Sequence, residues 1–258
     1  MSKDFAGIAN LRNIALTLRY DGTKYHGWQR QKNAVTVQET LENAISEVIG
    51  GQVSVTGCGR TDAGVHAEYY IANFRSDCTI PEERIPFALN SRLPEDIVVR
   101  QAREVPWDFH AVFNCKRKEY TYRIHNTEFR DPLFNNRVWW YPQSLDIDAM
   151  RLGAAEFIGT HDFSAVRAVG TNVKSTVRTV FSFDIFENYG IINFRVAADG
   201  FLYNMVRAMV GTLVYVGVGK IQPSEIADIL ASKTRSLAGP TVPPQGLYMT
   251  NADYDIEL

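Results

Sequence analysis

A glycine-rich segment at residues 57–66 holds the side chains best suited to chemistry. In Gly59-Arg60-Thr61-Asp62, a guanidinium, a hydroxyl and a carboxylate follow one another directly after a glycine. Glycine permits positive φ and close approach of a ligand, so this sequence favours a site at the end of a strand. In such a site Asp62 would act as a nucleophile or a general base. The alternative is a solvated turn in which Asp62 hydrogen-bonds its own backbone.

Arg207 is the second candidate for chemistry. It is the only charged residue between positions 201 and 218, where apolar residues recur at helical spacing. A partly buried arginine needs an anion, because an unpaired buried charge is strongly unfavourable. We expect Asp62 to be that anion, and the ion pair would keep Asp62 deprotonated, as a nucleophile requires. A solvated arginine on a surface helix is the alternative.

Two tyrosines beside a basic cluster form a candidate binding surface. Tyr120 and Tyr122 alternate along a predicted strand that follows Lys116-Arg117-Lys118. Basic residues next to aromatic ones are the combination that holds a nucleic-acid backbone and stacks a base. The alternative is a strand with one tyrosine in the core and the other on the surface.

Several other kinds of site are absent from the sequence. The histidines are far apart and no Cys-x-x-Cys pair occurs, so we predict no metal site. No phosphate-binding loop, dinucleotide fingerprint or Gly-x-Ser-x-Gly motif is present. His66 lies close to Asp62 but is expected to be a polar residue at the start of a strand. The formal net charge of −2 indicates that any RNA binding depends on local clusters such as Arg30-Gln31-Lys32.

The composition is that of a soluble globular protein. The chain has 258 residues, of which 45% are hydrophobic and 22% charged, enough for one large domain or two ordinary ones. Three scattered cysteines suit a reducing cytosol, and residues 1–7 have no apolar core of signal-peptide length. The apolar stretch 201–218 is interrupted by polar residues, so it predicts a buried helix and no membrane span.

In the first half, strand and helix patterns alternate. Thr36 and Glu39 form a capping box for a helix that Gly50-Gly51 ends. The remaining patterns predict a short helix over residues 81–90 and strands over residues 14–20, 53–58, 68–74 and 97–104. The resulting order, β-α-β-β-α-β, is the split form that makes a ferredoxin-like sandwich.

The second half repeats this order more loosely. Its patterns predict helices over residues 145–158, 201–216 and 223–231, and strands over residues 119–125, 177–186, 191–198 and 246–254. We therefore predict an α+β protein of two ferredoxin-like, RNA-recognition-motif-like domains, residues 1–108 with Asp62 and residues 109–258. Their antiparallel sheets would join into one extended sheet around a central cleft, a shape that suits a nucleic acid.

Short motifs along nearly the whole chain carry a family resemblance. They lie at residues 20–31, 37–39, 59–67, 88–90, 93–94, 96–97, 108–111, 120–122, 161–163, 205–207 and 246–248. Together they resemble the tRNA pseudouridine synthase A family. The resemblance implies an isomerase that converts uridine to pseudouridine at positions 38, 39 and 40 in the anticodon stem-loop of tRNAs. It further implies a homodimer with no cofactor or metal, in which one tRNA contacts both subunits.

The resemblance also implies roles for individual residues. Asp62 matches the catalytic aspartate, Tyr120 the active-site tyrosine and Arg207 the arginine paired with the aspartate. Arg60 matches the arginine associated with the flipped-out nucleotide. The expected substrate-binding residues are Arg60, Tyr120, Arg30, Lys116, Arg117 and Leu247.

The implied reaction is consistent with these residue types. It breaks N1–C1′ and makes C5–C1′ on the same base without redox change, and the base must first leave the stack. The carboxylate of Asp62 would attack the uracil ring or C1′, or assist formation of a glycal, and the sequence does not select among these routes. Two other functions compete with this one: an RNA-binding module without catalysis, and a nucleoside hydrolase that would release free uracil.

Overall fold

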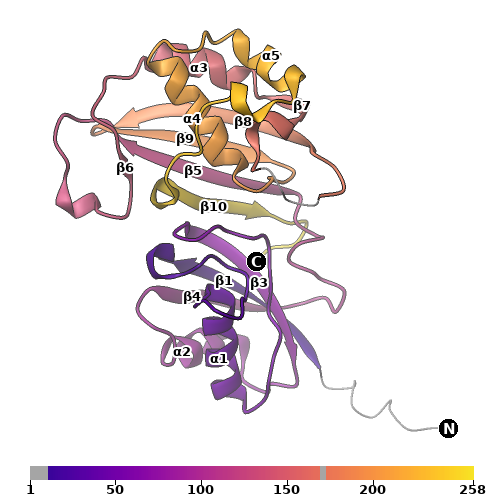
Figure 1. The fold of residues 1–258 in the computed structure, drawn as a ribbon. Coiled ribbons are helices and arrows are strands. Elements are labelled where there is room, and N and C mark those ends of the chain that lie inside the picture. The colour runs from indigo at the N-terminus through magenta and orange to yellow at the C-terminus, as the bar shows by residue number, and fades with distance from the viewer. Residues whose placement is uncertain (1–10, 169–172) are drawn as a thin grey trace. The chain divides into compact units, whose positions relative to one another are not determined.

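The chain folds as an α+β protein of two compact units. The computed structural model describes residues 11–168 and 173–258, which hold ten strands and five α-helices (Figure 1). Residues 1–7, considered above for a signal peptide, lie outside these ranges. One unit comprises Met1–Lys116 and Asn251–Leu258, and the other Arg117–Thr250. The division thus falls later than residue 108, and the C-terminal residues belong to the first unit.

The first unit contains an antiparallel sheet with β1 at its centre. β1 (Arg12–Tyr20) pairs on one edge with β4 (Ile97–Val105) and on the other with β3 (His66–Ser76). β2 (Thr56–Gly57) pairs with β3. The side chains of Ile14, Leu16 and Leu18 in β1 are fully buried, so this strand forms the middle of the core.

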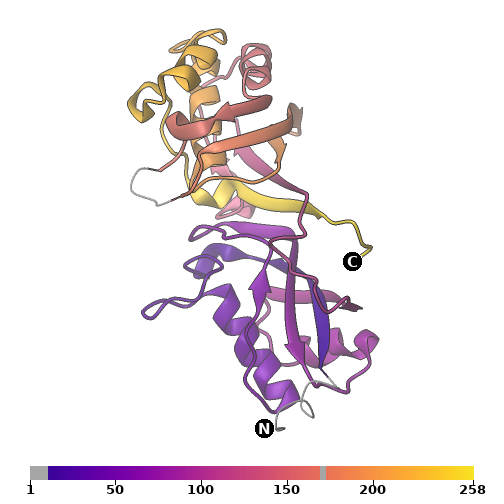
Figure 2. The ribbon, with the colours of Figure 1, turned by 90° about the vertical axis from the view of Figure 1, so that its right-hand side faces the viewer.

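Two helices complete the first unit. α1 (Val37–Ile49) lies on one side of the strands, and α2 (Ile85–Asn90) packs on β4 (Figures 1 and 2). The Oγ1 of Thr36 accepts the Glu39 N–H, and Gly50 ends α1 at a φ of 74°, as the capping pattern predicts. The second half of the capping box does not form, because the Glu39 carboxylate pairs with Arg30 instead.

The second unit has a larger sheet in the order β10-β5-β9-β8-β7, of which it holds residues 247–250 of β10. Neighbours from β5 to β7 pair in antiparallel fashion, and the two-residue β6 (Trp139–Trp140) pairs in parallel with β5. The strands are β5 (Arg117–His125), β7 (Gly159–Asp162), β8 (Val177–Asn188), β9 (Ile191–Ala198) and β10 (Leu247–Asp253). Tyr189 and Gly190 both have positive φ in the β8–β9 hairpin, the conformation of a two-residue type I′ turn.

Three helices belong to the second unit. α3 (Ile147–Ala155) contacts both α4 (Met205–Gly217) and β8, and α5 (Glu225–Ser232) follows α4 (Figure 1). The prediction that a helix begins at residue 201 is wrong, because Asn204 adopts a left-handed φ of 60° and the helix begins after it. No helix in residues 11–168 and 173–258 is long and apolar enough to cross a membrane.

Other boundaries also differ from the sequence patterns. The strand predicted over residues 53–58 is reduced to the two residues of β2. The helix predicted from residue 145 begins after Asp146, whose carboxylate accepts the Ala149 N–H at 2.9 Å. Short polar side chains at caps compete with the helical pattern, and they fix the ends that periodicity alone leaves open.

Candidate active site

Residues 57–65, here named the Asp62 loop, connect β2 to β3 in the first unit. The Val65 N–H donates to the Asp62 carbonyl at 3.1 Å, which closes a tight turn around Asp62. The Thr61 hydroxyl lies 2.9 Å from the Tyr20 hydroxyl, and the Tyr70 hydroxyl donates to the Gly59 carbonyl. Side chains from two strands therefore hold the loop on both sides of Arg60, which is exposed.

A second segment, residues 22–28, lies directly against the Asp62 loop. A Cβ on Gly22 would be 1.9 Å from the Val65 carbonyl oxygen, and one on Gly27 would be 2.2 Å from that of Thr61. The Trp28 N–H donates to the Thr61 carbonyl at 3.2 Å. Only glycine fits at such distances, so these two glycines permit the backbone contact that fixes the position of the loop.

An aromatic cluster lies beneath the loop. The rings of Trp28 and Tyr70 have centroids 4.3 Å apart, and those of Tyr20 and Tyr70 are 5.6 Å apart. Gly57 lies against this cluster, because a Cβ there would be 2.2 Å from the Tyr70 hydroxyl. Burial raises the pKa of Tyr20 far above its ordinary value, although the hydrogen bond with Thr61 opposes the shift. The base of the loop is therefore aromatic, and the Tyr20 hydroxyl stays uncharged.

His66 supports the 22–28 segment. It is the first residue of β3, as the sequence predicts, and it is buried. Its Nδ1 accepts the Gly22 N–H at 3.1 Å and lies 3.0 Å from an Asp21 carboxylate oxygen. These contacts link the start of β3 to the segment that lies against the Asp62 loop.

In the second unit, two contacts orient the guanidinium of Arg207. Its Nε donates to the Val242 carbonyl at 2.7 Å, and its Nη1 donates to the Asn204 side-chain oxygen at 2.8 Å. The Val242 N–H donates in turn to the Arg207 carbonyl at 3.3 Å. The left-handed backbone of Asn204 and the loop before β10 together set the direction of this side chain. The sequence places Asn204 on the same helix face, but it does not indicate these two partners.

Both tyrosines of the Tyr-x-Tyr pair are buried. Residues i and i+2 of a strand share a face, and the alternative of one core and one surface tyrosine does not hold. The rings of Tyr120 and Phe201 pack edge to face, with centroids 5.1 Å apart. The Tyr122 hydroxyl donates to the Pro243 carbonyl at 2.7 Å. Burial raises the pKa of Tyr122 well above its ordinary value, and the nearby charge of Arg207 lowers it in part.

Three of the basic residues predicted to bind substrate, Lys116, Arg117 and Arg30, have acidic neighbours. Lys116 Nζ lies 3.0 Å from an Asp255 oxygen, and an Arg117 nitrogen lies 3.5 Å from a Glu119 oxygen. Arg30 pairs with two carboxylates of α1, those of Glu39 and Glu42. Leu247, the first residue of β10, is buried. The positive charge of these clusters is therefore partly compensated within the chain.

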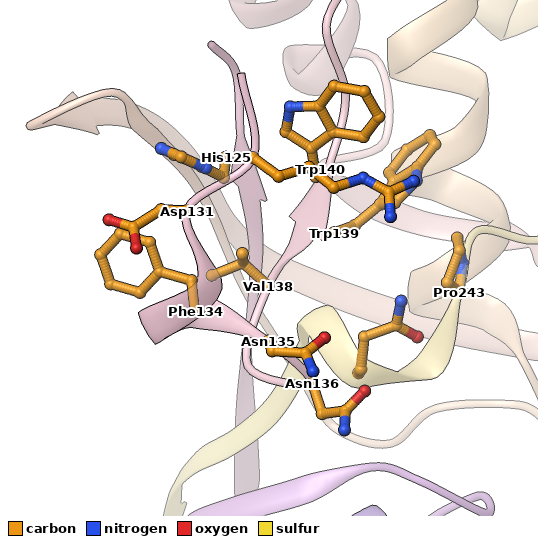
Figure 3. A pocket seen from close by; sticks show the side chains of 11 residues that line it. His125, Asp131, Phe134, Asn135, Asn136, Val138, Trp139, Trp140 and Pro243 are labelled. Carbon is orange, nitrogen blue, oxygen red and sulfur yellow. The ribbon is translucent and has the colours of Figure 1, made fainter. Parts of the chain in front are cut away.

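The second unit also contains a pocket of about 300 Å³ that the sequence did not indicate (Figure 3). It lies beside β6, and the Arg130 guanidinium lies 4.5 Å from the centre of a Trp140 ring. None of the predicted site residues lines it. Its lining residues are His125, Arg130, Asp131, Phe134, Asn135, Asn136, Val138, Trp139, Trp140, Pro243 and Gln245. In residues 11–168 and 173–258, no group of three acidic, histidine or cysteine side chains is placed to hold a metal.

Comparison with known proteins identifies the family. A family model described as tRNA pseudouridine synthase matches residues 17–114 and 154–255. The chain is 52% identical to tRNA pseudouridine synthase A of Thermoanaerobacter sp. (strain X514) over 244 residues, 95% of this chain and 100% of that protein. The protein of the same name in Acetivibrio thermocellus is 47% identical over 244 residues, with the same coverage. The chain therefore belongs to the tRNA pseudouridine synthase A family and is an isomerase.

Proposed function

We propose that this enzyme forms pseudouridine at positions 38, 39 and 40 in the anticodon stem-loop of tRNAs, with Asp62 as the nucleophile. The observation that carries the proposal is the Asp62 loop, in which Asp62 is presented between Arg60 and Gly64 on a tightly fixed backbone. Hydrogen bonds hold that backbone at Gly59, Thr61 and Gly64, through the Tyr70 hydroxyl, the Trp28 N–H and the Tyr25 carbonyl. Such preorganisation is what a carboxylate needs to meet a single atom of a flipped-out uridine.

The other site residues have complementary roles in this proposal. Arg207 pairs with Asp62 and keeps it deprotonated, and its fixed contacts with Asn204 and Val242 support a role in orientation. Tyr120 stacks on the uracil and helps to remove the C5 proton. Arg60, exposed on the Asp62 loop, handles the extruded nucleotide.

The reaction is balanced without a cofactor. The N1–C1′ bond breaks, the base turns, C5–C1′ forms, C5 loses its proton and N1 gains one. All three routes open to Asp62 require a deprotonated carboxylate held against one face of the nucleotide. These routes are attack on the uracil ring, attack on C1′ and assistance to formation of a glycal. The proposed ion pair with Arg207, in a site that excludes water, keeps the carboxylate deprotonated and in place.

We also propose that both halves are ferredoxin-like, that their sheets join around a central cleft, and that a cytoplasmic homodimer binds tRNA. The strand order β4-β1-β3, with β2 on β3, supports the ferredoxin-like topology of the first half. The order β10-β5-β9-β8 supports the same topology for the second half. The homodimer is proposed from the family resemblance, and the cytoplasmic location from the three scattered cysteines.

Substitution of Asp62 tests the proposed chemistry. Asp62→Asn should abolish pseudouridine in tRNA transcripts, read as carbodiimide-dependent reverse-transcription stops at positions 38, 39 and 40, while tRNA binding stays intact. Asp77→Asn, the same change at an exposed position of the first unit, is the matched control and should retain full activity. Substantial product from Asp62→Asn would defeat the assignment of the nucleophile. Free uracil from the wild type would indicate a hydrolase, and binding without any change of the RNA would indicate a binding module.

A further inference from the structure

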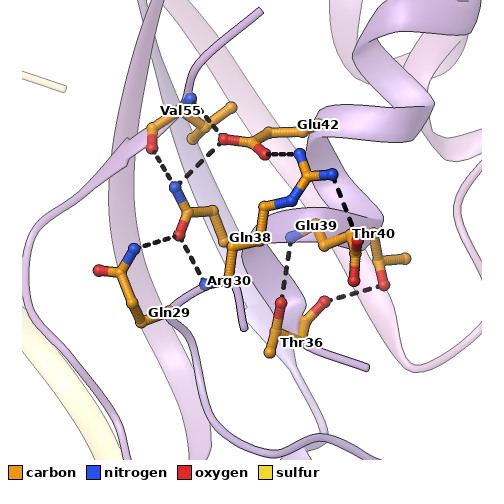
Figure 4. A network of polar contacts seen from close by, with 8 residues as sticks. All are labelled: Gln29, Arg30, Thr36, Gln38, Glu39, Thr40, Glu42 and Val55. Carbon is orange, nitrogen blue, oxygen red and sulfur yellow. Dashed lines mark hydrogen bonds and ion pairs between the residues drawn. The ribbon is translucent and has the colours of Figure 1, made fainter. Parts of the chain in front are cut away.

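A buried polar network connects α1 to Arg30 and to Val55 (Figure 4). Its members, here named the Gln38–Glu42 network, are Arg30, Gln38, Glu42 and the backbone of Val55. The Glu42 carboxylate accepts the Val55 N–H at 3.0 Å and the Gln38 amide at 3.1 Å on one oxygen. Its other oxygen lies 3.1 Å from the Arg30 guanidinium.

Gln38 has a hydrogen-bond partner on both sides of its amide. Its oxygen accepts the Arg30 N–H and the Gln29 side-chain amide, each at 2.9 Å, and its nitrogen also donates to the Val55 carbonyl at 2.9 Å. Gln38 is 8% exposed and Glu42 is 5% exposed. Burying a carboxylate and an amide is unfavourable unless every partner is supplied, so this network specifies one geometry for the segments that it joins.

One route from the network to Asp62 runs along the chain. Val55, bonded by Glu42 and Gln38 through its N–H and its carbonyl, is followed directly by β2. β2 ends at Gly57, where the Asp62 loop begins against the rings of Trp28 and Tyr70. A shift of Val55 is therefore transmitted to the first residues of the loop.

The second route runs through space. The first N–H groups of α1, those of Val37 and Gln38, donate to the carbonyls of Gly27 and Trp28 at 3.2 and 3.0 Å. The Trp28 N–H then donates to the Thr61 carbonyl, one residue before Asp62. The network thus fixes the segment that contacts the loop as well as the strand that leads into it.

We propose that Gln38, Glu42 and Arg30 are positioning residues for Asp62, which act by holding both approaches to its loop. The proposal rests on the proposed role of Asp62 in the reaction. It assigns the Arg30 guanidinium to the buried carboxylate of Glu42 rather than to an RNA phosphate. Small displacements of a reacting group lower the rate of the chemical step without weakening substrate binding.

Glu42→Gln is the first test. The new side chain has the same shape and its oxygen can still bond Val55 and Gln38, but an amide nitrogen would face Arg30 and the charge pair is lost. We expect kcat to fall about ten-fold, with tRNA affinity unchanged, at a temperature where the variant is fully folded. Glu39→Gln is the matched control, because Glu39 contacts the same arginine at 3.4 Å but its side chain is 30% exposed; its kcat should equal that of the wild type.

Substitutions of Arg30 keep the proposal testable if Glu42→Gln does not fold. The Arg30 side chain is 56% exposed, so its replacement leaves no large cavity. Arg30→Gln should lower kcat with an unchanged salt dependence of tRNA binding, and Arg30→Lys should recover part of the loss. If Arg30→Gln instead weakens tRNA binding and reduces the logarithmic salt slope by about one, Arg30 binds phosphate and the proposal is wrong.

Hydrogen exchange and Asp62→Asn separate this proposal from the proposed function. In Glu42→Gln, amides of residues 57–65 should exchange faster while those of β1 stay protected. Unchanged exchange and unchanged kcat in a folded Glu42→Gln protein, beside an inactive Asp62→Asn, would overturn the positioning role alone. An active Asp62→Asn would overturn the proposed function, whatever the network variants show.

Discussion

Gly27 and Thr61 are in backbone contact although 34 positions separate them in the sequence. Gly27 has a φ of 82°, and a Cβ there would lie 2.2 Å from the Thr61 carbonyl oxygen and 3.0 Å from the carbonyl carbon of Asp62. This contact places the candidate nucleophile relative to the start of α1, because the Gly27 carbonyl accepts the Val37 N–H. The site is thus built from the close approach of two loops as well as from the side chain of Asp62.

Gly27→Ala should lower both stability and activity. The added methyl group meets a backbone atom and must also adopt a positive φ, so we expect a loss of about 2–3 kcal/mol in the free energy of unfolding and a lower kcat. Urea denaturation and pseudouridine formation measure the two effects. Gly50→Ala is the control, because Gly50 also has a positive φ, of 74°, but a Cβ added there would have no atom within 4 Å. It should lose only about 1 kcal/mol and keep its kcat. Equal kcat for both variants would refute the role of the contact.

Arg207→Lys should separate charge from orientation. A lysine keeps the positive charge, but its single ammonium cannot reproduce the forked contacts with Val242 and Asn204. We expect kcat to fall about 100-fold with little change in tRNA affinity. Single-turnover kinetics and filter binding measure these quantities. Arg195→Lys is the control and should be fully active, because Arg195 in β9 forms an exposed ion pair with Asp184 in β8. A wild-type kcat in Arg207→Lys would show that the two guanidinium contacts with Val242 and Asn204 are not required for the reaction.

Binding of tRNA should depend strongly on salt, and Lys116 should contribute to that dependence. With a net charge of −2, the chain must bind phosphate through local clusters, so affinity should fall steeply as salt rises. Lys116→Gln should reduce the logarithmic salt slope by about one. Asp255→Asn removes the carboxylate 3.0 Å from Lys116 and should tighten binding. Affinity that does not change with salt would exclude a phosphate-binding surface on these clusters.

Stability should fall at alkaline pH because of buried tyrosines. The pKa values of Tyr20 and Tyr122 are raised by burial, so the unfolded chain releases these protons at a pH of about 10 while the folded chain retains them. The contribution of these tyrosines to the free energy of unfolding is fully present below that pH and is lost as the pH rises above it. Urea denaturation between pH about 8 and about 11 measures the loss. Tyr20→Phe removes one titrating group and should flatten the decline, and a stability that stays constant over this range would contradict the assignment.

The sequence by itself determined features whose causes are local. Thr36 and Gly50 set the ends of α1, and the Asn188-Tyr189-Gly190 turn sets the hairpin of β8 and β9, because caps and left-handed turns depend on a few adjacent residues. Short motifs along nearly the whole chain, including the one around Asp62, together indicated the family, which the comparisons confirmed.

Tertiary structure decided which partner each of these side chains takes. Arg30 contacts Glu42, twelve positions away, and Arg207 contacts Val242, thirty-five positions away. Neither contact has a periodic signature in the sequence. The same holds for the start of α4, where Asn204 has a left-handed backbone and its side-chain oxygen accepts a hydrogen bond from the Arg207 guanidinium. Local patterns fix backbone conformation over a few residues, whereas buried polar groups must find partners wherever folding brings a donor and an acceptor together.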